Sequence, residues 1–212
     1  ALTMSNTDED TLRAMRMTSP ALQEWWPDGE SPCSTWKGVT WCDGRVTGLD
    51  LEYCELVALP PEIGLPALTN LVLCVRKPST LVPLSDHRTL QSLSIFFFGG
   101  RDSQVPEVTT QLPLVLPELR HLHIKTGEQP AFWWPQDPLE AVLFSVPSIP
   151  SQQSRFPKIE SITIDDHAVT QGLKAQFVYS MACAFLVPIT VNHVGAASDI
   201  DEVLPWICTA FP

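Results

Sequence analysis

The chain has 212 residues and a formal net charge of −11 at pH 7. Proteins hold phosphate backbones with clustered lysine and arginine, so this acidic balance excludes nucleic acid as an expected partner and favours a basic surface. Hydrophobic residues make up 44% of the chain, which is enough for a sizeable core. No apolar run approaches the roughly 20 residues that span a bilayer, so membrane attachment is expected only through segments outside this chain.

The first predicted element is an amphipathic helix over residues 7 to 26. Thr7 opens it, Asp10 follows three residues later, and an acidic first turn suits the helix dipole. Pro20 should divide this helix into two short ones. A small hairpin is expected next over residues 32–42, with Trp36 and Trp41 covering the end of the structure that follows.

From residue 46 onward the chain repeats one apolar pattern. Seven times an apolar residue is followed at +3 and +5 by two more, and these triplets begin at positions 46, 68, 90, 119, 139, 159 and 186. Steps of this length between successive starts are typical of solenoids. We therefore predict an α/β solenoid, an arc whose concave side is a parallel sheet of about seven strands. The triplets are Val46-Leu49-Leu51, Leu68-Leu71-Leu73, Leu90-Leu93-Ile95, Leu119-Leu122-Ile124, Leu139-Val142-Phe144, Ile159-Ile162-Ile164 and Leu186-Ile189-Val191.

Two stretches near the start resemble a known family. The runs from Trp36 to Cys42 and from Gly44 to Leu51, continued by Leu59-Pro60-Pro61-Glu62-Ile63-Gly64, are similar to the N-terminal cap and first repeat of plant-type leucine-rich-repeat proteins. Such caps occur in receptor-kinase ectodomains, polygalacturonase-inhibiting proteins and kinetoplastid surface antigens. The resemblance covers about residues 8 to 73 and implies an extracellular recognition module. Cys54 occupies the family's ladder position, where an Asn or Cys is usual. The equivalent positions in later repeats carry neither: Arg76, Phe98, Gly127, Pro147, His167 and Val194.

The cysteines favour an oxidising compartment. There are six, and we expect disulfides in the two caps, Cys33 with Cys42 and Cys183 with Cys208. The protein is therefore expected to be secreted or on the cell surface, against the alternative of six buried thiols in a cytosolic protein. Whether Cys54 and Cys74 form a disulfide stays open. Their offset of two residues on neighbouring strands predicts Cα atoms roughly 8 Å apart, too far for an unstrained bridge.

The returns between strands are expected to change along the chain. Prolines before several strands favour extended returns, with examples at Pro66, Pro117 and Pro157. An apolar stripe every four residues predicts a helix over 168 to 185, and a shorter helix is expected over 199 to 208. We expect one domain over 1–212, with an N-terminal cap at 1–45, repeats at 46–191 and a C-terminal cap at 192–212.

Strand side chains alternate, so the residues between the apolar ones should form a recognition surface on the concave face. Aromatic and apolar residues rimmed by polar ones are typical of binding hot spots. The alternative is a normal surface with a few exposed apolar residues. The predicted ligand-binding residues are Asp50, Glu52, Val72, Ser94, Phe96, His121, His123, Lys125, Leu143 and Asp165.

Two further kinds of chemistry are conceivable on this face. His121 and His123 project together but lack a third ligand nearby, so no metal is predicted. Ser94, His123 and Asp165 are expected on strands three apart at the extremes, roughly 14 Å, which argues against a catalytic triad. No enzyme activity and no cofactor are expected.

The sequence thus predicts a recognition module that holds a protein or peptide on its concave face. The alternatives are a secreted inhibitor of a hydrolase and a structural or adhesion component of a parasite coat.

Overall fold

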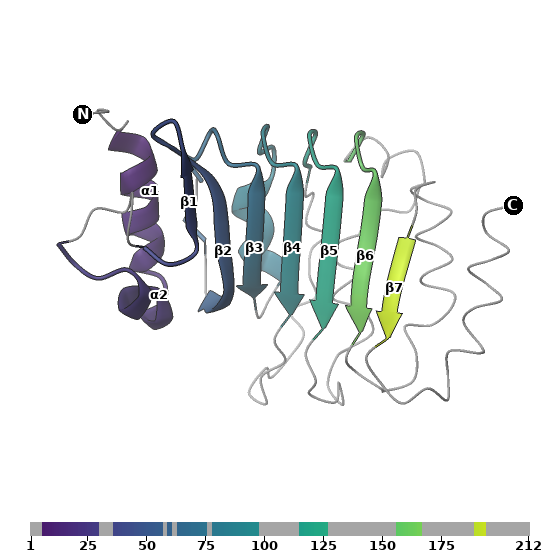
Figure 1. The fold of residues 1–212 in the computed structure, drawn as a ribbon, viewed down its shortest axis with the longest axis horizontal. Coiled ribbons are helices and arrows are strands. Elements are labelled where there is room, and N and C mark those ends of the chain that lie inside the picture. The colour runs from purple at the N-terminus through teal and green to yellow at the C-terminus, as the bar shows by residue number, and fades with distance from the viewer. Residues whose placement is uncertain are drawn as a thin grey trace, which may run out of the picture.

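Six parallel strands and one antiparallel strand form a single sheet in chain order (Figure 1). The computed structural model describes residues 6–29, 36–56, 59–60, 63–75, 78–97, 115–126, 156–166 and 189–193. The mostly parallel α/β sheet predicted from the sequence is confirmed. The strands are β1 (Val39–Cys42), β2 (Arg45–Leu56), β3 (Asn70–Val75), β4 (Ser92–Phe97), β5 (His121–Thr126), β6 (Ser161–Asp166) and β7 (Ile189–His193), and β1 is the antiparallel one.

The expected position of one strand is wrong. The triplet from Leu139 to Phe144 should have supplied a strand between those that begin near His121 and Ser161, but β5 pairs directly with β6. β5 and β6 are therefore neighbours in the sheet, without the intervening strand that was expected. Leu139, Glu140 and Ala141 prefer helix over strand, and an apolar spacing alone does not outweigh that preference. Residues 139–144, Leu143 included, lie outside the described residues.

Two short helices precede the sheet, as predicted. α1 (Asn6–Arg16) and α2 (Pro20–Trp25) are separated at Ser19, whose backbone is extended, and Pro20 begins the second helix. Proline has no amide hydrogen to donate and favours the first helical position. α1 buries Leu12 and Met15, which are three residues apart and therefore share a face.

The start of the sheet is covered by the N-terminal segment. Asp8 of α1 is 1% exposed and accepts hydrogen bonds from Arg45 Nη2 at 2.8 Å and from the Val46 amide at 2.9 Å. Trp26 stacks on Trp36 with ring centroids 4.9 Å apart. The extent of the hairpin expected within residues 32–42 is wrong, because β1 pairs with β2 across the turn at Asp43 and Gly44. Trp36 is 3% exposed, as expected of a side chain that covers the sheet.

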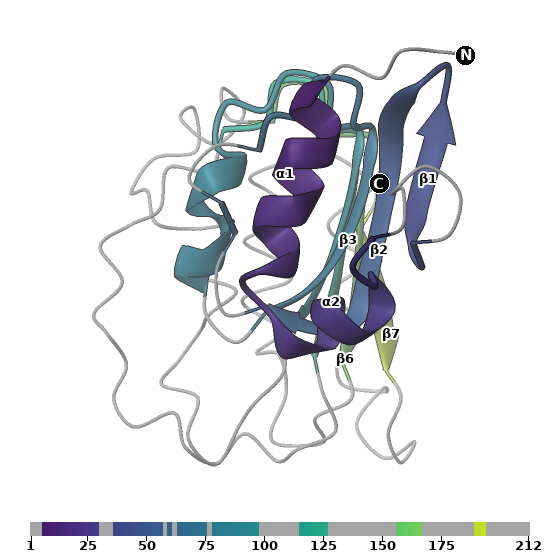
Figure 2. The ribbon, with the colours of Figure 1, turned by 90° about the vertical axis from the view of Figure 1, so that its left-hand side faces the viewer.

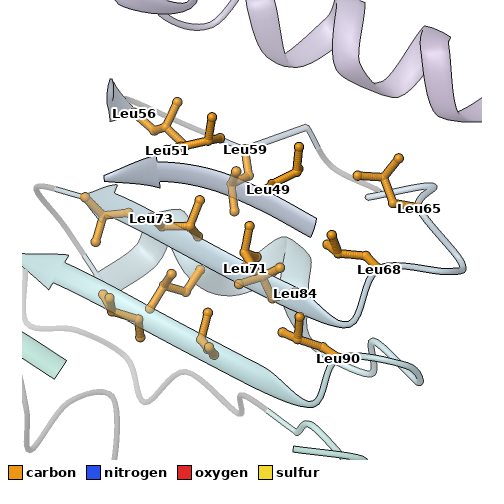
Figure 3. Close-up of a cluster of buried hydrophobic side chains, with 14 of the residues drawn as sticks. Leu49, Leu51, Leu56, Leu59, Leu65, Leu68, Leu71, Leu73, Leu84 and Leu90 are labelled. Carbon is orange, nitrogen blue, oxygen red and sulfur yellow. The ribbon is translucent and has the colours of Figure 1, made fainter. Parts of the chain in front are cut away.

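The core lies on one face of the sheet, between the strands and their returns. Leucine side chains from β2 and β3 pack there with Leu84 and Leu90 (Figure 3). A 3-10 helix, η1 (Pro78–Leu84), which was not predicted, adds Leu81 and Leu84 to this core. η1 and α1 lie on the same side of the sheet (Figure 2). No described helix is long and apolar enough to cross a membrane.

Backbone hydrogen bonds continue the sheet upstream of β3, β4, β5 and β6. The Thr69 amide donates to Thr47 O at 2.9 Å, and the Gln91 amide donates to Thr69 O at 2.9 Å. The same contact recurs between Arg120 and Gln91 at 2.8 Å and between Glu160 and Arg120 at 2.7 Å. This ladder holds neighbouring strands in one register, so equivalent side chains line up across the sheet.

The described cysteines are Cys42, Cys54 and Cys74, and none of the three is bonded to another. Cys54 belongs to the buried core cluster, whereas Cys74 alternates with the core residues Leu73 and Val75 and so belongs to the opposite face. The predicted partners Cys33, Cys183 and Cys208 lie outside the described residues, so the two cap disulfides stay predictions. The helices expected over 168–185 and 199–208 also lie outside them.

Candidate binding face

The face of the sheet opposite the leucine core carries aligned polar side chains, and we name it the open face. It is the face expected to be concave. Because Leu71, Leu93 and Leu122 point into the core, the residues that alternate with them occupy the open face. Strand pairing arranges these in three rows: first Gly48, Asn70, Ser92, His121 and Ser161; second Asp50, Val72, Ser94, His123 and Thr163; third Cys74, Phe96, Lys125 and Asp165.

Nine of the ten predicted ligand-binding residues are described, and all nine come from the strands of this face. Leu143 is the exception. Eight fall in the three rows, and Glu52 follows Asp50 in β2 at a point where the strand leaves regular pairing. The alternation of side chains along a strand is sufficient to predict this grouping.

His123 and Asp165 form a close pair on the open face. His123 Nε2 lies 2.7 Å from Asp165 Oδ2, and both side chains are partly buried. The separation expected between Ser94 and Asp165 is wrong, because it counted a strand between β5 and β6. Ser94 is directly opposite His123 on β4. Within the described residues, however, the imidazole is hydrogen bonded to Asp165 and not to Ser94.

A second histidine contact lies one row away and is more exposed. His121 Nδ1 is 2.9 Å from Ser161 Oγ, and His121 Nε2 is 4.0 Å from Glu160. Glu160 also accepts a hydrogen bond from Arg120 Nη1. Arg120 and Glu160 were not predicted as site residues, because each precedes its strand and falls outside the alternating pattern.

Lys125 joins strands that are not neighbours. Its Nζ donates to Glu52 Oε1 at 2.9 Å, although β3 and β4 lie between the two strands. The hydrogen bond to Glu52 raises the pKa of Lys125, and the charge of Asp165 adds to this effect. The cation is therefore held among carboxylates, and it does not present an open positive site.

An irregularity in β2 creates a feature that sequence reasoning missed. Leu51 pairs with Leu73, but the next pairing joins Glu55 to Cys74, so β2 bulges by several residues. Tyr53 in this bulge is 78% exposed. Strict alternation would have turned Tyr53 inward, so no signal in the sequence predicted an exposed aromatic ring here.

Both buried thiols of this region are poor nucleophiles. Burial raises the pKa of Cys54 to about 11, and Asp50 adds to that increase. Burial also raises the pKa of Cys74 to about 11, and the neighbouring Cys54 and Glu52 add to it. Thiolate is the reactive form of cysteine, so neither group suits covalent chemistry near neutral pH.

The chemical character of the open face is polar and mixed. It combines hydroxyl, amide, imidazole and carboxylate groups with one partly buried aromatic ring, Phe96. The exposed Tyr53 is near enough to Lys125 of this face to act on its charge. In the described part of the chain, no three histidine, cysteine or acidic side chains group closely enough to hold a metal ion. Such a face can hydrogen bond to a ligand along several strands. Compared with models of protein families, with curated proteins and with solved structures, the chain matches none of them.

Proposed function

We propose that the protein is a recognition module that binds a protein or peptide on the open face. The observation that carries this proposal is the strand register, which aligns two rows of side chains over β2 to β6 and a third over β3 to β6, without a covering helix among the described residues. Six parallel strands about 4.8 Å apart extend over about 24 Å, a width that suits a polypeptide ligand.

The finer fold proposal is a leucine-rich-repeat solenoid. Its support is the regular interval that places Leu49, Leu71 and Leu93 in equivalent pairs on β2, β3 and β4. Each such unit leaves its apolar face uncovered by itself, and stacking against the next unit buries it. An extracellular location, secreted or on the cell surface, belongs to the same proposal and rests on the cysteine pattern.

Binding energy on such a face is expected to concentrate on a few side chains. Phe96 and Tyr53 supply aromatic surface, and His123 is held in place by Asp165. Aromatic residues are enriched in binding hot spots, and a side chain held in position loses less entropy when a ligand binds. The acidic charge of the whole chain favours a partner with a basic surface.

The test is a surface-display screen for a partner, followed by measurement of its Kd. Combined Tyr53→Ala, Phe96→Ala and His123→Ala substitutions are expected to weaken binding by at least about tenfold, the effect of losing one hot spot. Val82→Ala is the matched control, since Val82 is exposed on η1, on the other side of the sheet. Equal affinity of the triple variant and the wild type would show that the open face is not the binding surface.

A further inference from the structure

The ion pair between Lys125 and Glu52 crosses the open face. Their strands are separated by three strand spacings, about 14 Å at 4.8 Å each. Their polar atoms nevertheless meet at 2.9 Å. A lysine and a glutamate bridge that distance only when both side chains lie extended along the sheet. The pair must therefore pass above side chains of β3 and β4.

The side chains beneath are Cys74 and Phe96. Strand pairing places Cys74, Phe96 and Lys125 in one row across β3, β4 and β5. Cys74 is only 5% exposed, although it alternates with the core residues Leu73 and Val75 and so belongs to the open face. Glu52 is among the groups that raise the pKa of Cys74, which means that its carboxylate lies near the thiol. Phe96 is partly buried.

The pair is partly exposed to water. Lys125 and Glu52 are 28% and 26% exposed, and ordering two long side chains costs conformational entropy. Ion pairs in contact with water contribute little to stability and are screened by salt. Opening this pair would uncover an aromatic ring and a thiol at the middle of the face.

We propose that the Lys125–Glu52 ion pair is a displaceable cover over an apolar anchor site formed by Phe96 and Cys74. The protein or peptide that binds the open face inserts an apolar side chain at this site once the ion pair has opened. The role in binding rests on the proposed function, whereas the cover itself can be tested without a partner.

The test measures alkylation of Cys74 by iodoacetamide, a small neutral probe, in the full chain. Lys125→Gln and Glu52→Gln are each expected to accelerate labelling of Cys74 by about twofold to fivefold, as loss of one exposed ion pair implies. Mass spectrometry identifies the labelled cysteine. Trypsin leaves both thiols on the peptide 46–76, and a further cleavage after Glu55 separates Cys54 from Cys74.

Comparing the two variants distinguishes steric covering of Cys74 from an electrostatic effect on its pKa. Loss of the Glu52 charge lowers the pKa of Cys74, so Glu52→Gln would accelerate labelling even without a cover. Loss of the Lys125 charge removes a nearby cation and, without a cover, would leave labelling unchanged or slower. Faster labelling of Cys74 in Lys125→Gln therefore supports the cover, and unchanged or slower labelling overturns it.

Controls come from the chain itself. Lys158→Gln breaks a similar pair, in which Lys158 Nζ lies 2.6 Å from Glu118, and should not change the labelling of Cys74. Cys54, which is 0% exposed in the core, should stay protected in each variant unless the fold is lost. If Cys54 becomes reactive together with Cys74, general loosening explains the result and the proposal fails. If the combined Tyr53→Ala, Phe96→Ala and His123→Ala variant binds the partner as tightly as the wild type does, the role in binding is wrong. That result would not affect the proposal that the ion pair covers Cys74.

Discussion

Individual residues show how burial changes chemistry in this protein. His87 lies between η1 and β4, is partly buried, and its Nδ1 has no hydrogen-bond partner among the described residues. Burial lowers its pKa from the ordinary 6.5, and a hydrogen bond to the Leu65 backbone opposes that shift only in part. Neither effect is visible in the sequence, where His87 is one of five histidines.

The lowered pKa of His87 predicts a loss of stability in mild acid. The unfolded chain binds a proton near pH 6.5, where folded His87 still resists it, so protons favour unfolding as the pH falls below that value. Urea unfolding between about pH 7.5 and about pH 5.5 should show a smaller decline for His87→Gln than for the wild type. His121→Gln, at a half-exposed site, is the control. The same decline in His87→Gln and the wild type would refute this assignment.

At the scale of elements, the β1–β2 hairpin depends on one close backbone approach. The Asp50 amide donates to Gly38 O at 2.7 Å, and a Cβ atom at Gly38 would lie 2.1 Å from Asp50 O. Gly38 also has φ +78°, a left-handed conformation that side chains disfavour. Gly44 has a similar φ of +77°, but its added Cβ would meet nothing within 4 Å. A side chain at Gly38 would therefore meet both backbone strain and a steric clash, whereas one at Gly44 would meet backbone strain alone.

Gly38→Ala should destabilise the protein more than Gly44→Ala does. Both substitutions carry the cost of a left-handed residue, about 1–2 kcal/mol, and collision with Asp50 adds about 1–3 kcal/mol at Gly38. Chemical unfolding measures the difference in the free energy of unfolding. Equal destabilisation by the two substitutions would mean that the close approach at Gly38 contributes nothing.

The sequence pattern at this scale predicted helices and strands correctly where a local signal was strong. Pro20 divided the first helix as expected, and the apolar triplets placed β2 to β6 with the correct residues facing the core. It failed at Leu139–Phe144, where apolar spacing was present but the two neighbouring strands paired with each other. Strand pairing is a competition between segments far apart in sequence, and a local pattern does not reveal its outcome.

At the scale of the whole molecule, each parallel strand pairs through its backbone only with its neighbours in chain order. If β2 to β4 are interchangeable units, deleting residues 68–89 removes one complete repeat and places Leu90 where Leu68 was. The shortened protein should fold cooperatively with a lower free energy of unfolding, because one interface between units is lost. Circular dichroism and urea unfolding test this expectation.

The matched deletion removes residues 79–89 and leaves only Arg76, Lys77, Pro78, Leu90 and Gln91 between β3 and β4. Parallel strands need a crossover of about a dozen residues, so this deletion should abolish the pairing and the cooperative transition. If the protein tolerates deletion of residues 79–89 as well as it tolerates deletion of residues 68–89, the repeat is not a structural unit.

The sequence by itself determined which segments form β2 to β6 and which side chains face the core. The recurrence of the apolar triplet sets the first, and side-chain alternation sets the second, because both depend on residues close together in the chain. Only the tertiary structure decided the bulge that exposes Tyr53 and the contacts that organise the open face. Lys125 is 73 residues from Glu52, and His123 is 42 residues from Asp165. Such contacts depend on which strands become neighbours, and that is settled when the complete sheet assembles.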